Sequence, residues 1–312
     1  MENTMANIML SHMNHWKTIP YKKIDNFREY YYEDRSNNVY FQDWDRILRY
    51  HKALGYDGIE LAPWDMHEMM ALFGTPENFR DFAADHGLKI SGMFHGVEGA
   101  HIASNSDAII ESGKAAVDLI ERFGGETMGT CPGSDYASAP GPLSEEGVRN
   151  VGKVLDEIGR YAVDHGVRLG IHNEFFCSIN KENHRHLLEI TDPRYTFYYL
   201  DTAQISIIGE DLLKFYEDYH ERMCGFHLKD TADPKLPDYI RYSPHVEIQE
   251  DGHRWFWEPG EGVLDFPGLW ALMKKYGFKG WVSVEDDGTP DLLASMALSS
   301  YYVMNKLKPI YW

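Results

Sequence analysis

Short apolar runs alternate with longer amphipathic segments along the whole chain. The short runs have the length and composition of buried strands, and the longer segments carry apolar residues at helical spacing. Strict alternation of this kind predicts parallel strands joined by helices. The expected strands are ANIMLSHM (6–13), DGIELAP (57–63), KISGMFHG (89–96), ETMGTCPG (126–133), VRLGIHNE (167–174), TFYYLDTA (196–203), MCGFHLKD (223–230) and KGWVSVED (279–286).

Helix ends are marked by glycines at Gly55, Gly87, Gly166 and Gly277, which predict left-handed C-caps and short turns into the next strand. Eight strand–helix units fit either a closed (β/α)₈ barrel or a doubly wound open sheet. The count of eight favours the α/β barrel, and the first strand is not followed by the Gly-x-Gly-x-x-Gly of a dinucleotide-binding sheet. We therefore predict one barrel domain spanning 1–312. The expected helices are 42–55, 75–87, 106–125, 145–166, 182–191, 210–223, 265–277 and 289–307.

Two expected connections are unusually long, at about 14–41 and 230–262. Both would leave the C-terminal face of the barrel, after strands one and seven, where such loops shape the substrate pocket. Their many tyrosines and tryptophans suit stacking on a sugar ring or an aromatic group. Self-packing of the loops, or a subunit interface, explains the same residues equally well.

The composition excludes several functions. Of 312 residues, 49 are acidic and 30 are Lys or Arg, so the formal charge of −19 argues against binding to nucleic acid or to an anionic membrane. Three cysteines without paired spacing do not suggest a disulfide framework. We see no signal peptide and no apolar segment long enough to span a bilayer, so we expect a cytoplasmic protein.

Potential metal ligands stand at the ends of the last four expected strands: Glu174, Asp201, His227 and Glu285. The carboxyl ends of neighbouring barrel strands converge, so these side chains are expected to meet. Three carboxylates and one imidazole suit Mn²⁺, Mg²⁺ or Co²⁺ better than a structural zinc. A lone carboxylate at a strand end is more often a helix cap or a surface ion pair, and a lone histidine is more often part of the core. All four together favour a metal site.

These residues, with FHLKD (226–230) and PGEGVLDFPGL (259–269), resemble the xylose-isomerase-like TIM-barrel superfamily. The superfamily includes sugar epimerases and isomerases, inosose dehydratase and hydroxypyruvate isomerase. The resemblance implies that the four residues bind one divalent ion, most often Mn²⁺, and that Glu174 and Glu285 also form a catalytic acid–base pair. An ion that holds a carbonyl oxygen acidifies the adjacent C–H, and a carboxylate on each face of the carbon then moves the proton.

Other residues are candidates for contact with the substrate. Lys229 lies two positions after His227, and His172 lies two positions before Glu174, so each shares the side of its neighbour. Lys229 would hold a hydroxyl or an oxyanion, and His172 would orient a ligand or touch substrate. Glu60, in GIELAP, faces the same end and would bind a hydroxyl or pair with a cation of the barrel.

His95 and Gln204 bear on the type of reaction. His95 ends the third expected strand, where it is either an extra acid–base group or a structural histidine. Gln204 stands three residues after Asp201, where many sugar epimerases and inosose dehydratases have histidine. Glutamine binds a hydroxyl but does not carry protons, so a direct transfer of those two assignments is in doubt.

The first hypothesis is a metal-dependent isomerase, epimerase or dehydratase that abstracts a proton next to the carbonyl of a sugar-like substrate. The alternative is a lyase that cleaves 3-keto-glycosides by elimination. The larger subunits of C-glycoside deglycosidases are similar barrels that work with a small β-rich partner, and His95 would assist the aromatic leaving group.

An endonuclease of the abasic-site type is disfavoured by the acidic charge and the single-ion ligand set. A catalytically inactive sugar-binding barrel is a fourth hypothesis. We expect a homo-oligomer or a hetero-oligomer with the small subunit.

Overall fold

The structure is a computed structural model of the 312-residue chain. The long connections expected at 14–41 and 230–262 lie mostly outside the residues that it describes. The described residues are 8–13, 40–63, 66–133, 143–172, 174–175, 177, 179, 181–234, 254–285, 287, 289 and 291–312.

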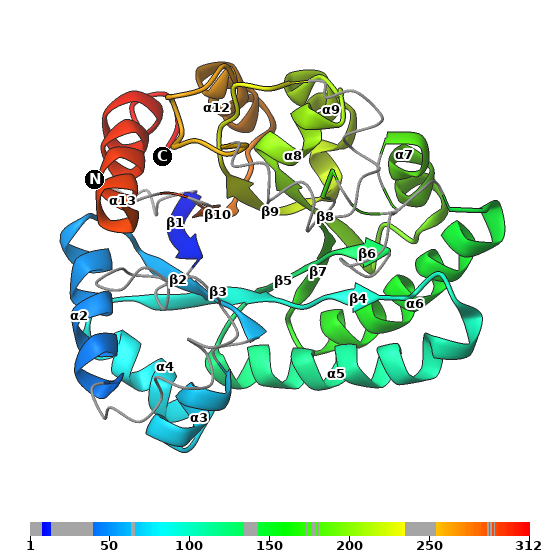
Figure 1. Ribbon diagram of the computed structural model, residues 1–312, viewed down its shortest axis with the longest axis horizontal. Coiled ribbons are helices and arrows are strands. Elements are labelled where there is room, and N and C mark those ends of the chain that lie inside the picture. Colours follow the sequence, from blue (N-terminus) through cyan, green and yellow to red (C-terminus); the bar gives the residue numbers. More distant parts are fainter. Residues whose placement is uncertain are drawn as a thin grey trace.

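Eight parallel strands close into a barrel, which confirms the predicted α/β TIM-barrel fold (Figure 1). Each strand pairs with its neighbours in sequence, and the first strand pairs with the last, with Ile8 opposite Gly280. Every barrel strand lies within one of the expected runs. The barrel strands are β1 (Ile8–Met13), β2 (Gly58–Leu61), β3 (Lys89–Phe94), β5 (Thr127–Thr130), β7 (Arg168–Ile171), β8 (Thr196–Asp201), β9 (Met223–Leu228) and β10 (Gly280–Val284).

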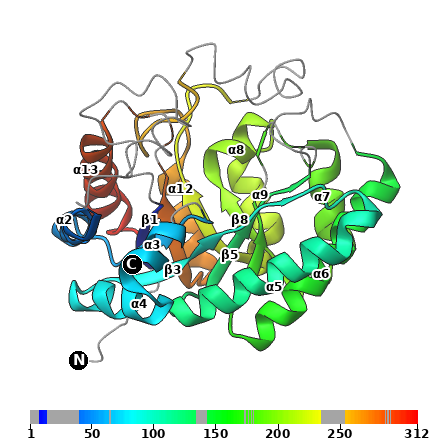
Figure 2. The ribbon, with the colours of Figure 1, turned by 60° about the horizontal axis from the view of Figure 1, so that its bottom comes forward.

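Helices surround the barrel, as Figures 1 and 2 show from two directions. No described helix is both long enough and apolar enough to cross a membrane. The short α3 and α8 were not expected, and all six residues of α8 are buried, so α8 has no amphipathic pattern to detect. The helices are α2 (Tyr40–Ala53), α3 (Met66–Phe73), α4 (Pro76–Asp85), α5 (Ser106–Phe123), α6 (Glu145–Asp164), α7 (Lys181–Ile190), α8 (Thr202–Ile207), α9 (Leu212–Tyr219), α12 (Phe266–Tyr276) and α13 (Leu292–Tyr302).

Capping residues fix where these helices start and stop. The Ser144 hydroxyl accepts a hydrogen bond from the Gly147 amide at the start of α6, and Thr75 caps α4 in the same way. The four glycines predicted to end helices all have positive φ, between 69° and 86°. Their left-handed conformation turns the chain directly into β2, β3, β7 and β10.

One aromatic side chain, that of Tyr199, lies inside the barrel and supports a residue near its carboxyl end. A Cβ on Gly225 would lie 2.3 Å from the Tyr199 ring, so glycine leaves the space that this ring occupies. Gly170 makes similar room, because its added Cβ would meet the Tyr199 Cβ at 2.8 Å. The Tyr199 hydroxyl can therefore reach across the barrel, and it donates a hydrogen bond to the Glu60 carboxylate at 2.7 Å.

Candidate metal centre

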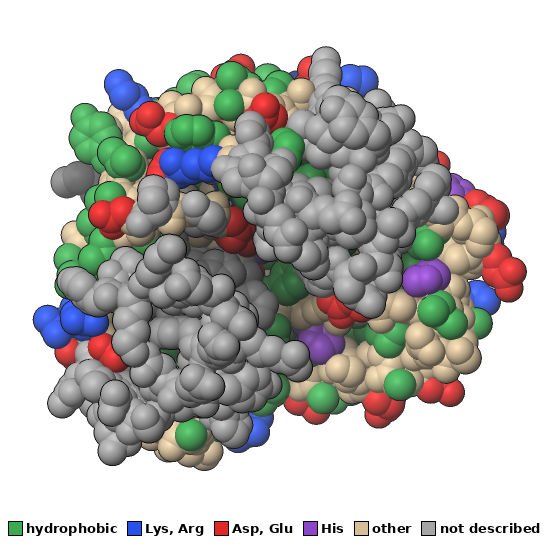
Figure 3. Space-filling view, in the orientation of Figure 1, with side chains coloured by type: hydrophobic (Ala, Val, Ile, Leu, Met, Phe, Trp, Pro, Cys, Tyr) green, Lys and Arg blue, Asp and Glu red, His purple; other side chains and the backbone are tan. Residues whose placement is uncertain are grey.

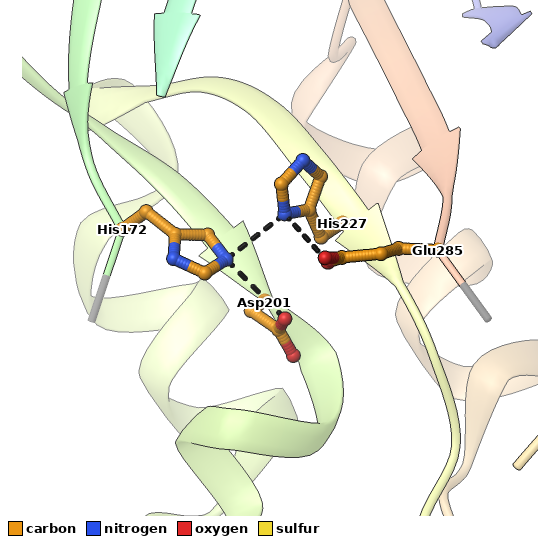
Figure 4. Close-up of side chains that lie close together, drawn as sticks. All are labelled: His172, Asp201, His227 and Glu285. Atoms are coloured by element: carbon orange, nitrogen blue, oxygen red, sulfur yellow. Dashed lines mark hydrogen bonds and ion pairs between the residues drawn. The ribbon is translucent and has the colours of Figure 1, made fainter. Parts of the chain in front are cut away.

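Four buried side chains meet at the carboxyl end of the barrel: His172, Asp201, His227 and Glu285 (Figure 4). His172 follows β7 directly, Asp201 ends β8, His227 lies in β9, and Glu285 follows β10. One ligand atom from each lies within 4.8 Å of all the others. His227 Nδ1 is 2.9 Å from both His172 Nε2 and Glu285 Oε2, and His172 Nε2 is 3.3 Å from Asp201 Oδ2. Three of the four side chains that were expected to meet, Asp201, His227 and Glu285, therefore lie together at the strand ends.

The chemistry of this group fits a divalent cation. Two imidazole nitrogens and two carboxylate oxygens form a mixed donor set that first-row divalent metals accept. The neighbouring Lys229 ammonium is outnumbered by carboxylates, since it lies 3.2 Å from Asp201 Oδ2, 2.6 Å from Glu285 Oε2 and 2.7 Å from Asp287 Oδ2. A buried excess of negative charge is stabilised by a bound cation.

Glu174 lies beside the group rather than within it. Its Oε1 is 3.7 Å from His172 Nδ1, whereas His172 Nε2 faces Asp201. The fourth member of the group is His172, which the sequence predicted to orient a ligand or to contact substrate. Burial raises the pKa of Glu174 to about 8, an effect that Lys229 opposes and Glu285 reinforces. The ligand role predicted for Glu174 stays a prediction.

Glu60 supports His227 from the opposite side. Its Oε1 lies 3.0 Å from His227 Nε2, and its Oε2 accepts the Tyr199 hydroxyl hydrogen bond. A carboxylate at one ring nitrogen orients the imidazole and leaves Nδ1 directed at the group. Burial alone would lower the pKa of His227, but Glu285 and Glu60 raise it well above its usual value. Positive charge is thus already favoured where an ion would bind.

Asp201 serves both the group and the scaffold. Its Oδ1 accepts hydrogen bonds from the amides of Ala203 at 3.0 Å and Gln204 at 2.8 Å, which caps α8 and leaves Oδ2 for the group. The Gln204 side-chain oxygen accepts a hydrogen bond from the Phe175 amide at 2.9 Å. Gln204, predicted to bind substrate, therefore also ties α8 to the segment that follows β7.

Comparison with known proteins identifies the family of the chain. The profile of a family described as Xylose isomerase-like TIM barrel matches residues 48–299. The chain belongs to this family. Among curated relatives, the inosose dehydratase of Lacticaseibacillus casei is 25% identical over 181 residues, which cover 56% of this chain and 59% of the relative. That of Mesomycoplasma hyopneumoniae (strain 7448) is 28% identical over 145 residues, covering 45% and 47%. The chain thus spans about half the length of these relatives.

Solved structures of low sequence identity share the fold of this xylose-isomerase-like barrel. A sugar phosphate isomerase/epimerase from Parabacteroides distasonis ATCC 8503 has a TM-score of 0.69 at 17% identity, covering 100% of this chain and 98% of its own. The probable 3-DHS dehydratase AsbF from Bacillus anthracis has a TM-score of 0.71 at 15% identity, covering 96% and 99%.

In this family member, Lys229 lies between the four-residue group and an aromatic wall. The wall consists of Phe175, Trp255 and Phe256. Burial would lower the pKa of Lys229, but Asp201, Asp287 and Glu285 raise it well above its usual value. Its ammonium lies 4.4 Å from the centre of the Phe256 ring. The ring of Phe175 lies 5.7 Å from Trp255 and 6.4 Å from Phe256, between centres. Figure 3 views this end of the barrel and shows described acidic and hydrophobic side chains in a hollow near its centre.

His95 faces away from the four-residue group. Its Nε2 lies 3.3 Å from the Ser112 hydroxyl on α5, whereas the preceding Phe94 packs its ring against His172 at 5.5 Å. Successive side chains of a strand point to opposite faces, which explains why only one of the two points inward. Burial lowers the pKa of His95. An acid–base role for His95 stays a prediction.

The sequence reading of this barrel missed two functional neighbours. Tyr199 supports Glu60, and its position two residues before Asp201 on the same strand was the available signal. Asp287, which pairs with Lys229, was not predicted as a site residue. Its contact depends on the path of the chain after β10, which strand alternation does not define.

Proposed function

We propose that the protein is a divalent-metal-dependent enzyme that removes a proton next to the carbonyl of a sugar-like substrate. The buried group of His172, Asp201, His227 and Glu285, with Glu174 beside it, is the observation that carries the proposal. The ion, when bound, polarises the substrate carbonyl and so acidifies the adjacent C–H. The product is an isomer, an epimer or a dehydrated compound, since all three begin with this proton transfer. Mn²⁺ is the ion that the family resemblance favours.

Glu174 is the group that we assign to proton removal. Its side chain is 13% exposed, so it is largely withdrawn from water while it stays next to His172. A carboxylate in such surroundings is a stronger base than one in water. Glu285 is the second member of the predicted acid–base pair, and Lys229, 2.6 Å from it, adds a fixed positive charge for an oxyanion.

The relatives support this class of reaction. Their names are inosose dehydratase, sugar phosphate isomerase/epimerase and probable 3-DHS dehydratase. Isomerisation, epimerisation and dehydration of polyhydroxylated carbonyl compounds share abstraction of an acidic C–H proton. The substrate class proposed here, a ketose or an oxidised cyclitol, follows from that common step.

A second candidate is a lyase that eliminates an aromatic aglycone from a 3-keto-glycoside. The observation that favours it is the aromatic wall, in which Phe256 lies against Lys229 and Phe175 lies near Trp255. Such rings suit a flat aromatic leaving group. This reading includes the small β-rich partner subunit of C-glycoside deglycosidases.

One experiment tests both functions. Metal-depleted protein is reloaded with Mn²⁺ and incubated in D₂O with a panel of ketoses and inososes, and separately with an aromatic 3-keto-glycoside. Deuterium on the carbon next to the carbonyl, or water loss from it, supports the first function, whereas release of the aglycone supports the second. Absence of both reactions, together with no ion bound at equimolar Mn²⁺, would overturn the proposal.

A further inference from the structure

A second cluster of metal-ligating side chains lies next to the first. Cys131, directly after β5, and Cys177, in the segment after β7, are buried with their sulfur atoms 3.0 Å apart. The Glu174 carboxylate completes the cluster, and the three ligand atoms lie within 4.8 Å of one another. The function proposed above does not use either thiol.

Backbone contacts hold the cluster in place from both sides. The Cys131 carbonyl accepts a hydrogen bond from the Val97 amide at 3.2 Å, and the Cys177 amide donates to the Glu174 carbonyl at 2.9 Å. The Phe175 amide between them donates to the Gln204 side chain. Ligands fixed by their own scaffold lose little conformational entropy when an ion binds.

We propose that Cys131, Cys177 and Glu174 form a second cation site, specific for a thiophilic divalent ion such as Zn²⁺ or Cd²⁺. Two sulfur ligands prefer soft ions, in contrast to the nitrogen and oxygen ligands of the first group. Three protein ligands with an open fourth position are a common arrangement for zinc. Binding exchanges two thiol protons for one divalent ion, and the protons pass to solvent.

The geometry needs a small adjustment for such an ion. Tetrahedral coordination with bonds of about 2.3 Å places two sulfur atoms roughly 3.8 Å apart, so the pair must open by less than about 1 Å. Cys177 lies in the connection after β7 rather than in the barrel wall, so this opening leaves the strand pairing intact.

Occupancy of this site would also regulate the first one. Glu174 Oε1 is 3.7 Å from His172 Nδ1, so the two clusters meet at this carboxylate. A thiophilic ion that takes Glu174 as a ligand withdraws it from proton transfer. This regulatory part rests on the proposed function, whereas binding of the ion does not.

Cobalt titration of the reduced, metal-free, full-length protein tests the site. Co²⁺ bound by thiolates gives an intense near-ultraviolet charge-transfer band, which nitrogen and oxygen ligands do not give. We expect the band in the wild-type protein and its loss in both Cys131→Ser and Cys177→Ser. Cys224→Ser is the matched control, because this third buried thiol lies in β9 and donates to the Tyr198 carbonyl instead. Asp201→Asn should weaken the first site and leave the band.

Several results would overturn the proposal. One is no band in the wild-type protein, and another is a band that persists in both serine variants. A third is a Cys131–Cys177 disulfide that forms without reductant while the reduced pair takes up no ion. If the serine variants do not fold, displacement of the wild-type band by Cd²⁺ but not by Mg²⁺ is the deciding measurement.

Activity measurements distinguish regulation by the second ion from its binding alone. With a substrate that exchanges deuterium, excess Zn²⁺ should inhibit the Mn²⁺ enzyme at least tenfold, and Cys131→Ser should relieve the inhibition. Equal inhibition of the wild-type and variant enzymes would contradict the regulatory part. Absence of exchange under all metal conditions would count against the proposed function alone, because the cobalt band reports binding directly.

Discussion

Asp201 shows how one residue can be tested for two roles. Its Oδ2 faces the metal group while its Oδ1 caps α8. Asparagine retains an acceptor for the cap but removes the charge. We predict that Asp201→Asn lowers Mn²⁺ affinity at least tenfold and changes Tm little, as measured by calorimetric titration and thermal unfolding. Asp211→Asn, which alters the equivalent cap of α9, should leave metal affinity unchanged. Equal affinities in the two variants would contradict the metal assignment.

A variant of Glu174 can show whether this residue acts as a base or as a metal ligand. We predict that Glu174→Gln reduces deuterium exchange by about 10²–10⁴-fold while the protein still binds one Mn²⁺. Loss of the ion together with activity would instead establish the ligand role that the sequence predicts. Glu77→Gln is the control, because Glu77 pairs with Arg122 at the surface.

Glu60 contacts His227 rather than the ion, so its substitution should change the affinity for the ion indirectly. We predict that Glu60→Gln weakens Mn²⁺ binding by about 10–100-fold, the usual effect of removing the carboxylate behind a ligating histidine. Tyr199→Phe, which removes only the hydrogen bond to Glu60, should have a smaller effect in the same titration. The assignment fails if neither change alters affinity.

Residue patterns predicted three of the four clustered side chains. Position at the end of an expected barrel strand is why Asp201, His227 and Glu285 were identified. Position in the sequence does not show how far each side chain extends past the end of its strand. Strand β7 ends at Ile171, and His172 rather than Glu174 points into the group. The pairing of Tyr199 with Glu60, 139 residues apart, depends on the stagger of the closed barrel, which local sequence does not encode.

At the scale of elements, one buried carboxylate organises the described residues that lead into α12. Asp230 accepts hydrogen bonds from the amides of Gly260, Gly262 and Leu264. Asp230→Ala would leave these amides unpaired, so we predict a loss of about 2–5 kcal/mol in the free energy of unfolding, measured by urea denaturation. Asp265→Ala, which removes the exposed cap of α12, should cost only about 1 kcal/mol. A reversed order of the two would contradict this role.

Strands and most helices were predictable because their signals are local. Each barrel strand is a short apolar run, and most long helices have a periodic apolar face ended by a cap. The buried α8 has neither signal, since the cap that starts it is Asp201 itself, which the sequence reading assigned to the metal. The formation of α8 therefore depends on tertiary burial rather than on a local pattern. This helix holds Gln204 in position.

At the scale of the whole molecule, buried neutral histidines make the fold sensitive to acid. Burial lowers the pKa of His51 from 6.5 to about 4, and that of His184 to about 3. The unfolded chain binds these protons below about pH 6.5, so this contribution to stability is complete above pH 6.5 and is lost as the pH falls toward 4.

Each such histidine contributes on the order of 3 kcal/mol to this dependence. We predict that the free energy of unfolding of the wild-type protein falls between pH 7.5 and 5, and that His51→Gln falls less steeply. Urea denaturation at both pH values measures the difference. Parallel pH profiles for the two proteins would show that His51 is not the titrating group.

The hydrogen bond from the Phe175 amide to Gln204 has an evolutionary consequence. Histidine at this position would supply a proton carrier but remove the side-chain carbonyl that anchors the segment bearing Glu174. The fitness effect of Gln204→His therefore depends on what else holds that segment. A substitution that anchors the segment independently would therefore have to come first, and position 204 is an expected site of epistasis.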